Sequence, residues 1–155
     1  MIEINPANSG ISVYDTTDGF LDGLNGLYNQ FWSDSYLTIN QIKQDPYNNT
    51  WIINPYSENF NHIAAVISGV DGSWNHITVN DSISYLPQEI AFDGSGRAWI
   101  SLQMEYAINN LHGLYSEGGL RILDWGLTPE DESDDYWLTI TDSINFHPGS
   151  VWSID

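Results

Sequence analysis

The stretch "PQEIAFDGSGRAWIS" at residues 87–101 decides the fold, because an earlier stretch, "INQIKQDPYNNTWII" at residues 39–53, keeps the same frame with different letters. The two align without gaps, and the matching positions are Ile42 with Ile90, Asp45 with Asp93, Trp51 with Trp99 and Ile52 with Ile100. A third copy begins at "GSVWSID" and reaches Asp155. A frame that recurs while its letters change is typical of a repeat architecture, in which each unit packs on the next.

Other short segments recur at matched places around this frame. They are "DSY" (34–36), "DSI" (81–83) and "DSI" (142–144), the pair "GISVYD" (10–15) and "GLRILD" (119–124), and Trp32, Trp74 and Trp137. Each segment is short, rich in Val, Ile, Tyr, Trp and Thr, and bounded by Gly, Asn, Asp or Pro, which is the pattern of β-strands. Four strands in a unit of roughly 40 to 50 residues are the dimensions of one β-propeller blade.

Turn chemistry explains why the Asp and the Trp of the frame are kept. An Asp carboxylate that begins a turn can accept backbone N–H groups about two residues further on, and the position three residues after it, Asn48 or Gly96, tolerates a positive φ. The next strand begins at Trp51 or Trp99. We expect these large side chains to seal the contact between neighbouring blades.

The sequence therefore predicts an all-β fold: an incomplete β-propeller with about two full four-stranded antiparallel blades and parts of two flanking blades. The expected division is a partial blade at 9–33, a blade at 34–80, a longer blade at 81–141 with an acidic insertion, and the first strand of the next blade at 142–155. Propellers close with about four to eight blades. Two open blade faces would cost on the order of 10 kcal/mol each in lost burial, which favours a piece of a longer propeller over self-association into a ring.

The frame resembles the two-component-regulator type of propeller repeat, in which an apolar residue, Asp, Gly and a Trp-Ile pair precede a Gly-Gly strand. The better copy supplies Ile90, Asp93, Gly96, Trp99, Ile100, Gly118, Gly119 and Leu120, and the weaker one supplies Ile42, Asp45, Asn49, Trp51 and Ile52. There are departures from the pattern. Asn48 and Arg97 stand where Gly and Asn are usual, and "NHIAAVIS" (61–68) replaces the Gly-Gly strand of the weaker copy.

The resemblance implies an extracytoplasmic propeller, either in a surface protein of the type IX secretion pathway, including PorZ-like N-terminal propellers, or in the sensor region of a hybrid histidine kinase. We expect a non-catalytic binding or scaffold module of a bacterial cell-surface or secreted protein. Its expected partners are the remaining blades of the parent propeller and a protein or glycan ligand. The alternatives are a ligand-sensing ectodomain and, with less support, a propeller lyase that would use His147 and a metal.

Charge excludes two classes of partner. Against 21 Asp and Glu stand only Lys43, Arg97 and Arg121, which gives a formal charge of −18. Such a chain repels nucleic-acid phosphates and anionic lipids. The charge therefore predicts no nucleic-acid partner. No apolar run approaches the roughly 20 residues of a membrane span, so we expect no membrane insertion. No signal peptide is recognisable at the start.

Two acidic segments and four histidines are the candidates for a metal or catalytic site. The acidic insertion contains Glu130, Asp131, Glu132, Asp134 and Asp135, and "DTTDGFLD" (15–22) contains Asp15, Asp18 and Asp22. Neither has the spacing of a Ca²⁺ loop, so a solvated loop and a polar turn are favoured, although Ca²⁺ binding by the insertion stays open. His62, His76, His112 and His147 share no metal-ligand spacing. We expect no catalytic, cofactor-binding or metal-binding residue.

The abundance of Trp and Tyr also suggests sugar binding, because aromatic faces stack on sugars. A structural role is favoured for Trp51 and Trp99 and for the matched set Trp32, Trp74 and Trp137. Trp125, beside the acidic insertion, and Trp152 are less constrained. Trp125 is therefore the candidate ligand contact.

Overall fold

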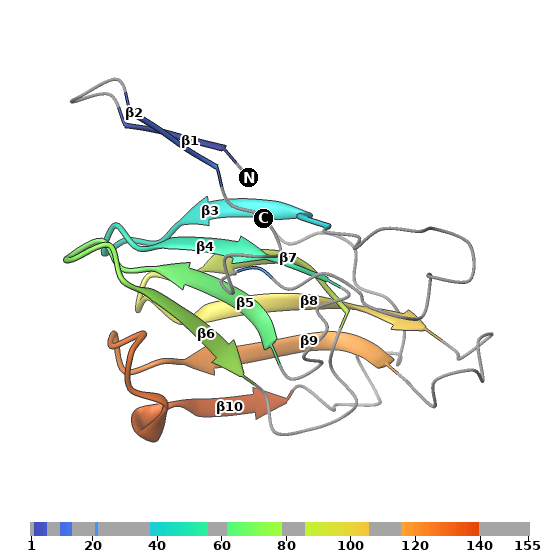
Figure 1. Ribbon diagram of the computed structural model, residues 1–155. Coiled ribbons are helices and arrows are strands. Elements are labelled where there is room, and N and C mark those ends of the chain that lie inside the picture. Colours follow the sequence, from blue (N-terminus) through green and yellow to red (C-terminus); the bar gives the residue numbers. More distant parts are fainter. Residues whose placement is uncertain are drawn as a thin grey trace, which may run out of the picture.

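The computed structural model describes residues 2–5, 10–13, 21, 38–55, 62–78, 86–105 and 116–139 (Figure 1). Within these ranges the chain forms β-strands and one short 3-10 turn, and no α-helix. The first four-stranded sheet, here sheet 1, contains β3 (Gln41–Gln44), β4 (Thr50–Ile53), β5 (His62–Ile67) and β6 (Trp74–Thr78). The second, sheet 2, contains β7 (Pro87–Phe92), β8 (Ala98–Glu105), β9 (Ser116–Asp124) and β10 (Tyr136–Thr139).

Both sheets are antiparallel meanders, in which each strand pairs with the next along the chain. Their first two strands share one register: Lys43 lies opposite Trp51 in sheet 1, and Ala91 lies opposite Trp99 in sheet 2. The all-β prediction with two four-stranded antiparallel units is thus confirmed. The matching residues of the two copies occupy matching places in space. Asp45 and Asp93 each follow the first strand, and Trp51 and Trp99 are each the second residue of the next strand.

A further antiparallel pair lies near the beginning of the chain. β1 (Ile2–Asn5) pairs with β2 (Gly10–Val13), and Ile2 lies opposite Val13. β1 precedes residue 9, at which the first partial blade was expected to begin, and no strand was predicted at residues 2–5. The last expected strand, in 142–155, lies outside the described residues.

Each sheet has two unlike faces, because successive side chains of a strand point to opposite sides. We call the side that carries Trp51 or Trp99 the Trp face, and the side that carries Ile52 or Ile100 the Ile face. Trp51 and Val66 lie opposite one another on the Trp face of sheet 1, and Ile52 and Ala65 on its Ile face. The buried residues divide accordingly into two clusters.

The Trp face of sheet 1 packs on the Ile face of sheet 2. The shared core contains Trp51, Ile53, Ala64, Val66 and Ile77 from sheet 1 and Ile90, Ala98, Ile100, Leu102 and Leu123 from sheet 2. Figure 1 shows the two sheets stacked, with the cyan and green strands of sheet 1 over the yellow and orange strands of sheet 2. The stacking is therefore head to tail, which is the relation between successive units of a repeat protein.

The Ile face of sheet 1 has a separate apolar cluster. Leu21, Ile52 and Ala65 form its buried part, and Trp74 packs against them. Trp74 lies opposite Ile67 on β5, and Trp137 lies opposite Leu123 on β9. These two Trp side chains thus occupy the same station in the two sheets.

Polar side chains join the innermost strands of the two sheets. The Asn40 amide donates to Gln88 Oε1 at 2.9 Å, and the backbone N–H of Ile90 donates to the Gln41 side-chain oxygen. β7 also lies directly against β3 and β4. The first strands of the two units consequently lie side by side, as the inner strands of neighbouring blades do.

Candidate functional site

The carboxylate of Asp45 organises the first turn of sheet 1. Its Oδ1 accepts the backbone N–H groups of Tyr47 at 2.8 Å and Asn49 at 2.9 Å. Its Oδ2 accepts the Asn49 side-chain amide at 2.8 Å and the indole N–H of Trp51 at 2.9 Å. Asp45 and Asn49 are both buried. A buried carboxylate with all of these donors in place is satisfied, so this group is fully engaged in holding the turn and the next strand together.

The carboxylate of Asp93 organises the first turn of sheet 2 in the same way, except that an Arg side chain donates in place of the Asn side chain. Its Oδ1 accepts the backbone N–H groups of Ser95 at 2.8 Å and Arg97 at 3.2 Å, and its Oδ2 accepts the Trp99 indole N–H at 3.1 Å. Arg97 replaces the Asn of the other copy and donates its Nε–H to Oδ2 at 2.7 Å. The hydrogen bond from Trp99, followed by those from Ser95 and Arg97, lowers the pKa of Asp93 to about 2.

The hydrogen bonds from the Trp indoles to the Asp carboxylates explain why the two residues lie six positions apart in both copies. The backbone N–H acceptor role of the Asp agrees with the turn chemistry expected from the sequence, and so do the positive φ values of Asn48 and Gly96, which are 69° and 85°. The hydrogen bond from the indole to the carboxylate was not predicted, since only a packing role was expected for the Trp. The invariant spacing between Asp and Trp was the available signal.

Trp51 also packs between the sheets. Its side chain is fully buried, and its ring lies edge-on to Phe92 and Trp125 of sheet 2, with centroids 5.4 and 5.6 Å apart. Trp99 lies on the Trp face of sheet 2 and is partly buried. Of the remaining signature positions, Ile90 is fully buried beneath sheet 1, Ile42 is exposed, and Gly119 lies in β9 with a φ of 94°.

The structure corrects the expectation for Trp125. Its side chain has 0% exposure, belongs to the shared core and donates its indole N–H to the backbone oxygen of Gly96 at 2.8 Å. It is therefore not available to a ligand. The ring of Tyr47 packs edge-on against Trp125, with centroids 6.0 Å apart, and the Tyr47 side chain is 45% exposed.

A tight turn explains the position of Trp125. Gly126 and Leu127 have φ values of 57° and 68°, and the backbone N–H of Thr128 donates to the oxygen of Trp125 at 3.1 Å. Positive φ at both central residues is the pattern of a type I′ turn, which reverses the chain at once and directs the indole back under the sheets. Leu127 is left 43% exposed at the tip.

The acidic insertion is exposed but held in place. Its 3-10 turn, η2 (Glu132–Asp134), is capped by Asp131, whose Oδ1 accepts the backbone N–H of Ser133 at 2.9 Å. The Thr128 hydroxyl donates to Asp134 at 2.7 Å. The Thr78 hydroxyl at the end of β6 donates to Glu132 at 3.0 Å. The insertion thus touches sheet 1 as well as its own sheet.

One carboxyl of the insertion is perturbed. Burial, and then the negative charges of Asp134, Glu132 and Asp131, raise the pKa of Asp135 to about 6. Within the described ranges no three His, Cys, Asp or Glu residues are grouped so that they could hold a metal ion. Residues 130–134 of the insertion are exposed, and Asp135 carries a partly buried carboxyl.

Two histidines that the sequence analysis treated as separate meet in the structure. His62 on β5 and His76 on β6 stack with parallel rings, 4.1 Å between centroids and 9° between planes. Their places on adjacent strands of one hairpin were the signal that linear spacing did not reveal. His112 and His147 lie outside the described residues, as do Asp155, Asp15, Asp18, Asp22, Trp32 and Trp152. In the part of the chain that the structure describes, no helix has the length and apolar character needed to cross a bilayer.

No protein-family model and no curated protein matches this chain. One solved structure is similar: PorZ, described as an essential bacterial surface component of the type IX secretion system of Porphyromonas gingivalis, with a TM-score of 0.59 and 14% sequence identity. The likeness covers 86% of this chain and 16% of the PorZ chain, so this chain corresponds to a small part of that protein's length. At this identity the likeness concerns the fold alone: the stacked four-stranded sheets are similar to part of the PorZ structure.

Proposed function

We propose that this chain is a non-catalytic β-propeller segment that serves as a binding or scaffold module of a bacterial surface or secreted protein, in the context of type IX secretion. The observation that carries the proposal is the likeness in fold to PorZ over 86% of the chain. The two-component-regulator type of repeat, first inferred from the Asp and Trp frame, supports the same assignment. Both support an extracytoplasmic location for the module.

The head-to-tail stacking supports the scaffold part of the proposal. Sheet 2 presents a Trp face like the one that sheet 1 buries, with Trp99 opposite Ile122 and Leu138 also opposite Ile122. Leu138 retains 37% exposure on this face. We propose that a further blade of the parent propeller packs there with its own Ile face, since heterologous contacts of this kind extend a stack until the ring closes.

The chemistry of the repeated carboxylates supports a non-catalytic role. A general acid or base needs a proton that can be exchanged with a substrate near neutral pH. Asp45 is buried and bound to four donors, and the pKa of Asp93 is held near 2 by its donors. The hydrogen bonds that Asp45 and Asp93 accept within the turns are sufficient to explain why a carboxylate occupies each position.

Accessibility of the protein on intact cells tests the location. An epitope tag placed in the native gene should react with antibody on intact cells, whereas a cytoplasmic control protein should react only after permeabilisation. Reaction of the tag only after permeabilisation of both membranes would contradict the proposed surface role.

Removal of residues 34–141 from the native gene tests the secretion context. We expect cargo proteins of the type IX system to accumulate inside the cell, and Asp45→Ala, which removes one turn carboxylate, to give a weaker form of the same defect. Normal export in the deletion strain would contradict the link to secretion while leaving the surface location to be judged by the antibody experiment.

A further inference from the structure

Four hairpin turns meet at one end of the two stacked sheets, and we call this surface the turn end. They are the turns at residues 45–49, 68–73, 93–97 and 124–135. Figure 1 shows them together at the left of the molecule. The backbone N–H of Gly69 donates to the Asn49 side chain at 2.8 Å and joins the first two. Trp125 joins the last two through its bond to Gly96.

An apolar patch lies at the centre of the turn end. A Cβ atom placed on Gly96 would lie 2.7 Å from Tyr47 Cε2 and 3.3 Å from Leu127 Cδ2, so both side chains meet above this glycine. Trp125 lies beneath them. Tyr47 comes from sheet 1 and Leu127 from sheet 2, and both remain nearly half exposed. The neighbouring turn presents Val70 with 93% exposure.

Leu127 occupies this place at a conformational cost. A residue with a Cβ atom is disfavoured at a φ of 68°, whereas Gly and Asn adopt it readily. A surface turn with no other task would accept either of those residues. An exposed leucine in a left-handed conformation is a local conflict of the kind that concentrates at binding surfaces.

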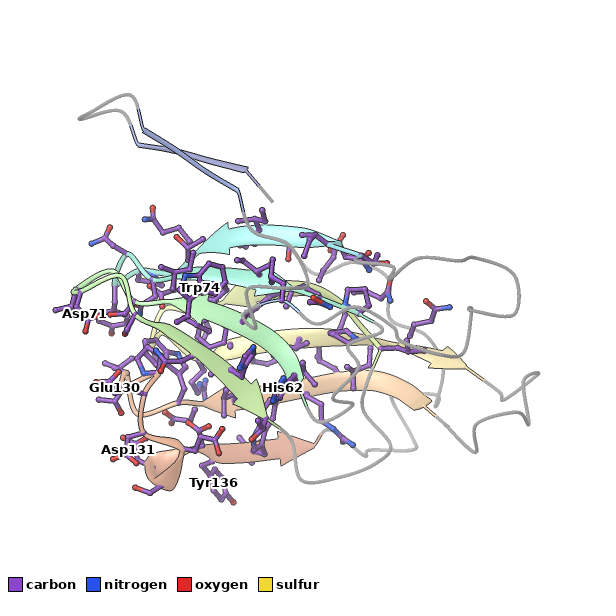
Figure 2. All side chains as sticks on the ribbon, viewed as in Figure 1. His62, Asp71, Trp74, Glu130, Asp131 and Tyr136 are labelled. Carbon is purple, nitrogen blue, oxygen red and sulfur yellow. The ribbon has the colours of Figure 1, made fainter. Side chains whose placement is uncertain are left out.

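The charges around the patch indicate its partner. Figure 2 shows the side chains of Asp71, Glu130 and Asp131 projecting from the same end of the sheets. The four turns contain one cationic residue, Arg97, and its guanidinium is bound to Asp93 at 2.7 Å. The patch is thus rimmed by negative charge, which favours a partner that combines positive charge with apolar side chains.

We propose that the turn end, centred on Tyr47 and Leu127, binds a basic polypeptide segment that carries apolar side chains. The inference rests on the proposed binding role and names its surface and partner. An apolar side chain of the partner packs against Tyr47 and Leu127, and its Lys or Arg residues lie among the surrounding carboxylates. A leucine at the centre of the patch favours this partner over a glycan.

Titration of the isotope-labelled protein with three probes tests the proposal. The probes are a short peptide of alternating Arg and Leu, a peptide of alternating Arg and Gly with the same charge, and a neutral oligosaccharide. We expect the Arg-Leu peptide to bind most tightly and to shift the amide resonances of Gly96, Leu127 and Tyr47. Equal affinity for the two peptides, or oligosaccharide binding at these residues in place of the peptide, would contradict it.

A matched pair of substitutions separates binding from folding. Leu127→Asn removes the apolar side chain at a φ that Asn accepts, and Leu138→Asn makes the same change at a similarly exposed position on the Trp face of sheet 2. We expect Leu127→Asn to weaken the affinity for the Arg-Leu peptide by about tenfold without lowering the melting temperature of the protein. Leu138→Asn should leave the affinity unchanged.

Three results would overturn the inference: unchanged affinity in Leu127→Asn, an equal loss in both variants, or a lower melting temperature in Leu127→Asn, which would show that this leucine is needed for folding. Peptide resonance shifts confined to the Trp face of sheet 2 would also reject the turn end and leave a binding role elsewhere. The antibody experiment on intact cells tests the proposed function independently of all these outcomes.

Discussion

Asp45 and Trp51 are joined by a hydrogen bond of 2.9 Å from the indole N–H to the carboxylate, and Asp93 and Trp99 are joined in the same way at 3.1 Å. The bond links a turn residue to the strand that follows. In sheet 1 it also fixes the orientation of the Trp51 indole, which lies between the two sheets. One short frame therefore specifies both the local turn and the contact with the next unit.

Asp45→Asn should destabilise the protein by about 2 to 4 kcal/mol, because a buried acceptor of several hydrogen bonds is replaced by a group that accepts at only one of its two atoms. The comparison is Asp71→Asn, at an exposed turn residue that accepts the backbone N–H of Ser73 at 2.9 Å. Urea unfolding at pH 7 measures both. A loss in Asp45→Asn no larger than that in Asp71→Asn would contradict the central role of this carboxylate.

The lowered pKa of Asp93 predicts a loss of stability in acid. The carboxyl has a pKa of about 2 in the folded protein against 3.8 ordinarily. Its contribution is therefore present above about pH 4 and disappears as the pH falls towards 2. Urea midpoints between pH 5 and pH 2 should fall more steeply in the native protein than in Asp93→Asn. Equal slopes in the two proteins would show that Asp93 does not titrate in this way.

Asp135 predicts the opposite dependence on pH. Its folded pKa of about 6 lies above the ordinary value of 3.8, so ionisation opposes folding and stability falls as the pH rises from about 4 through 6. Asp135→Asn should raise the melting temperature at pH 7.5 by about 2 to 4 °C, since solvent screens part of the effect. The gain should vanish at pH 4.

The control for Asp135 is Glu130→Gln, at an exposed residue of the same insertion. This substitution removes one negative charge from the loop but leaves the partly buried carboxyl of Asp135 in place. We expect little change in its melting temperature at either pH. An equal gain in both variants would assign the effect to the total charge of the loop rather than to Asp135.

Gly96→Ala should be destabilising by about 1 to 3 kcal/mol, because its φ is 85° and the new Cβ would lie 2.7 Å from the ring of Tyr47. Gly94→Ala, two residues earlier in the same turn, meets nothing within 4 Å and should cost much less. Thermal unfolding compares them. Combining Gly96→Ala with Tyr47→Ala should recover the steric part of the loss and leave the backbone part.

The Asp and Trp frame was sufficient to predict much of the fold. It predicted short strands, antiparallel four-stranded units, and positive φ at Asn48 and Gly96, because turn geometry and strand composition are encoded within a few residues. The shared register of the two units follows from the same local pattern, since the turn fixes which residues of adjacent strands face one another.

The features that were missed depend on contacts between distant segments. Trp125 follows an Asp and precedes an acidic loop, so its neighbours in sequence indicate exposure, yet the turn at Gly126 and Leu127 places it under Tyr47. The stacking of His62 on His76 requires the pairing of β5 with β6. Neither burial nor pairing of this kind is contained in a short window of sequence.

The adjacent residues Trp51 and Ile52 pack on opposite faces of sheet 1. Trp51 points into the core shared with sheet 2, and Ile52 points into the cluster that contains Leu21. A single dipeptide thus contributes to two separate apolar clusters, one on each face of sheet 1. Substitutions at Trp51 and at Ile52 should therefore weaken the packing on different faces of sheet 1. Because the Trp face of one sheet packs on the Ile face of the next, the stacking has a direction that a pairing of two like faces would lack.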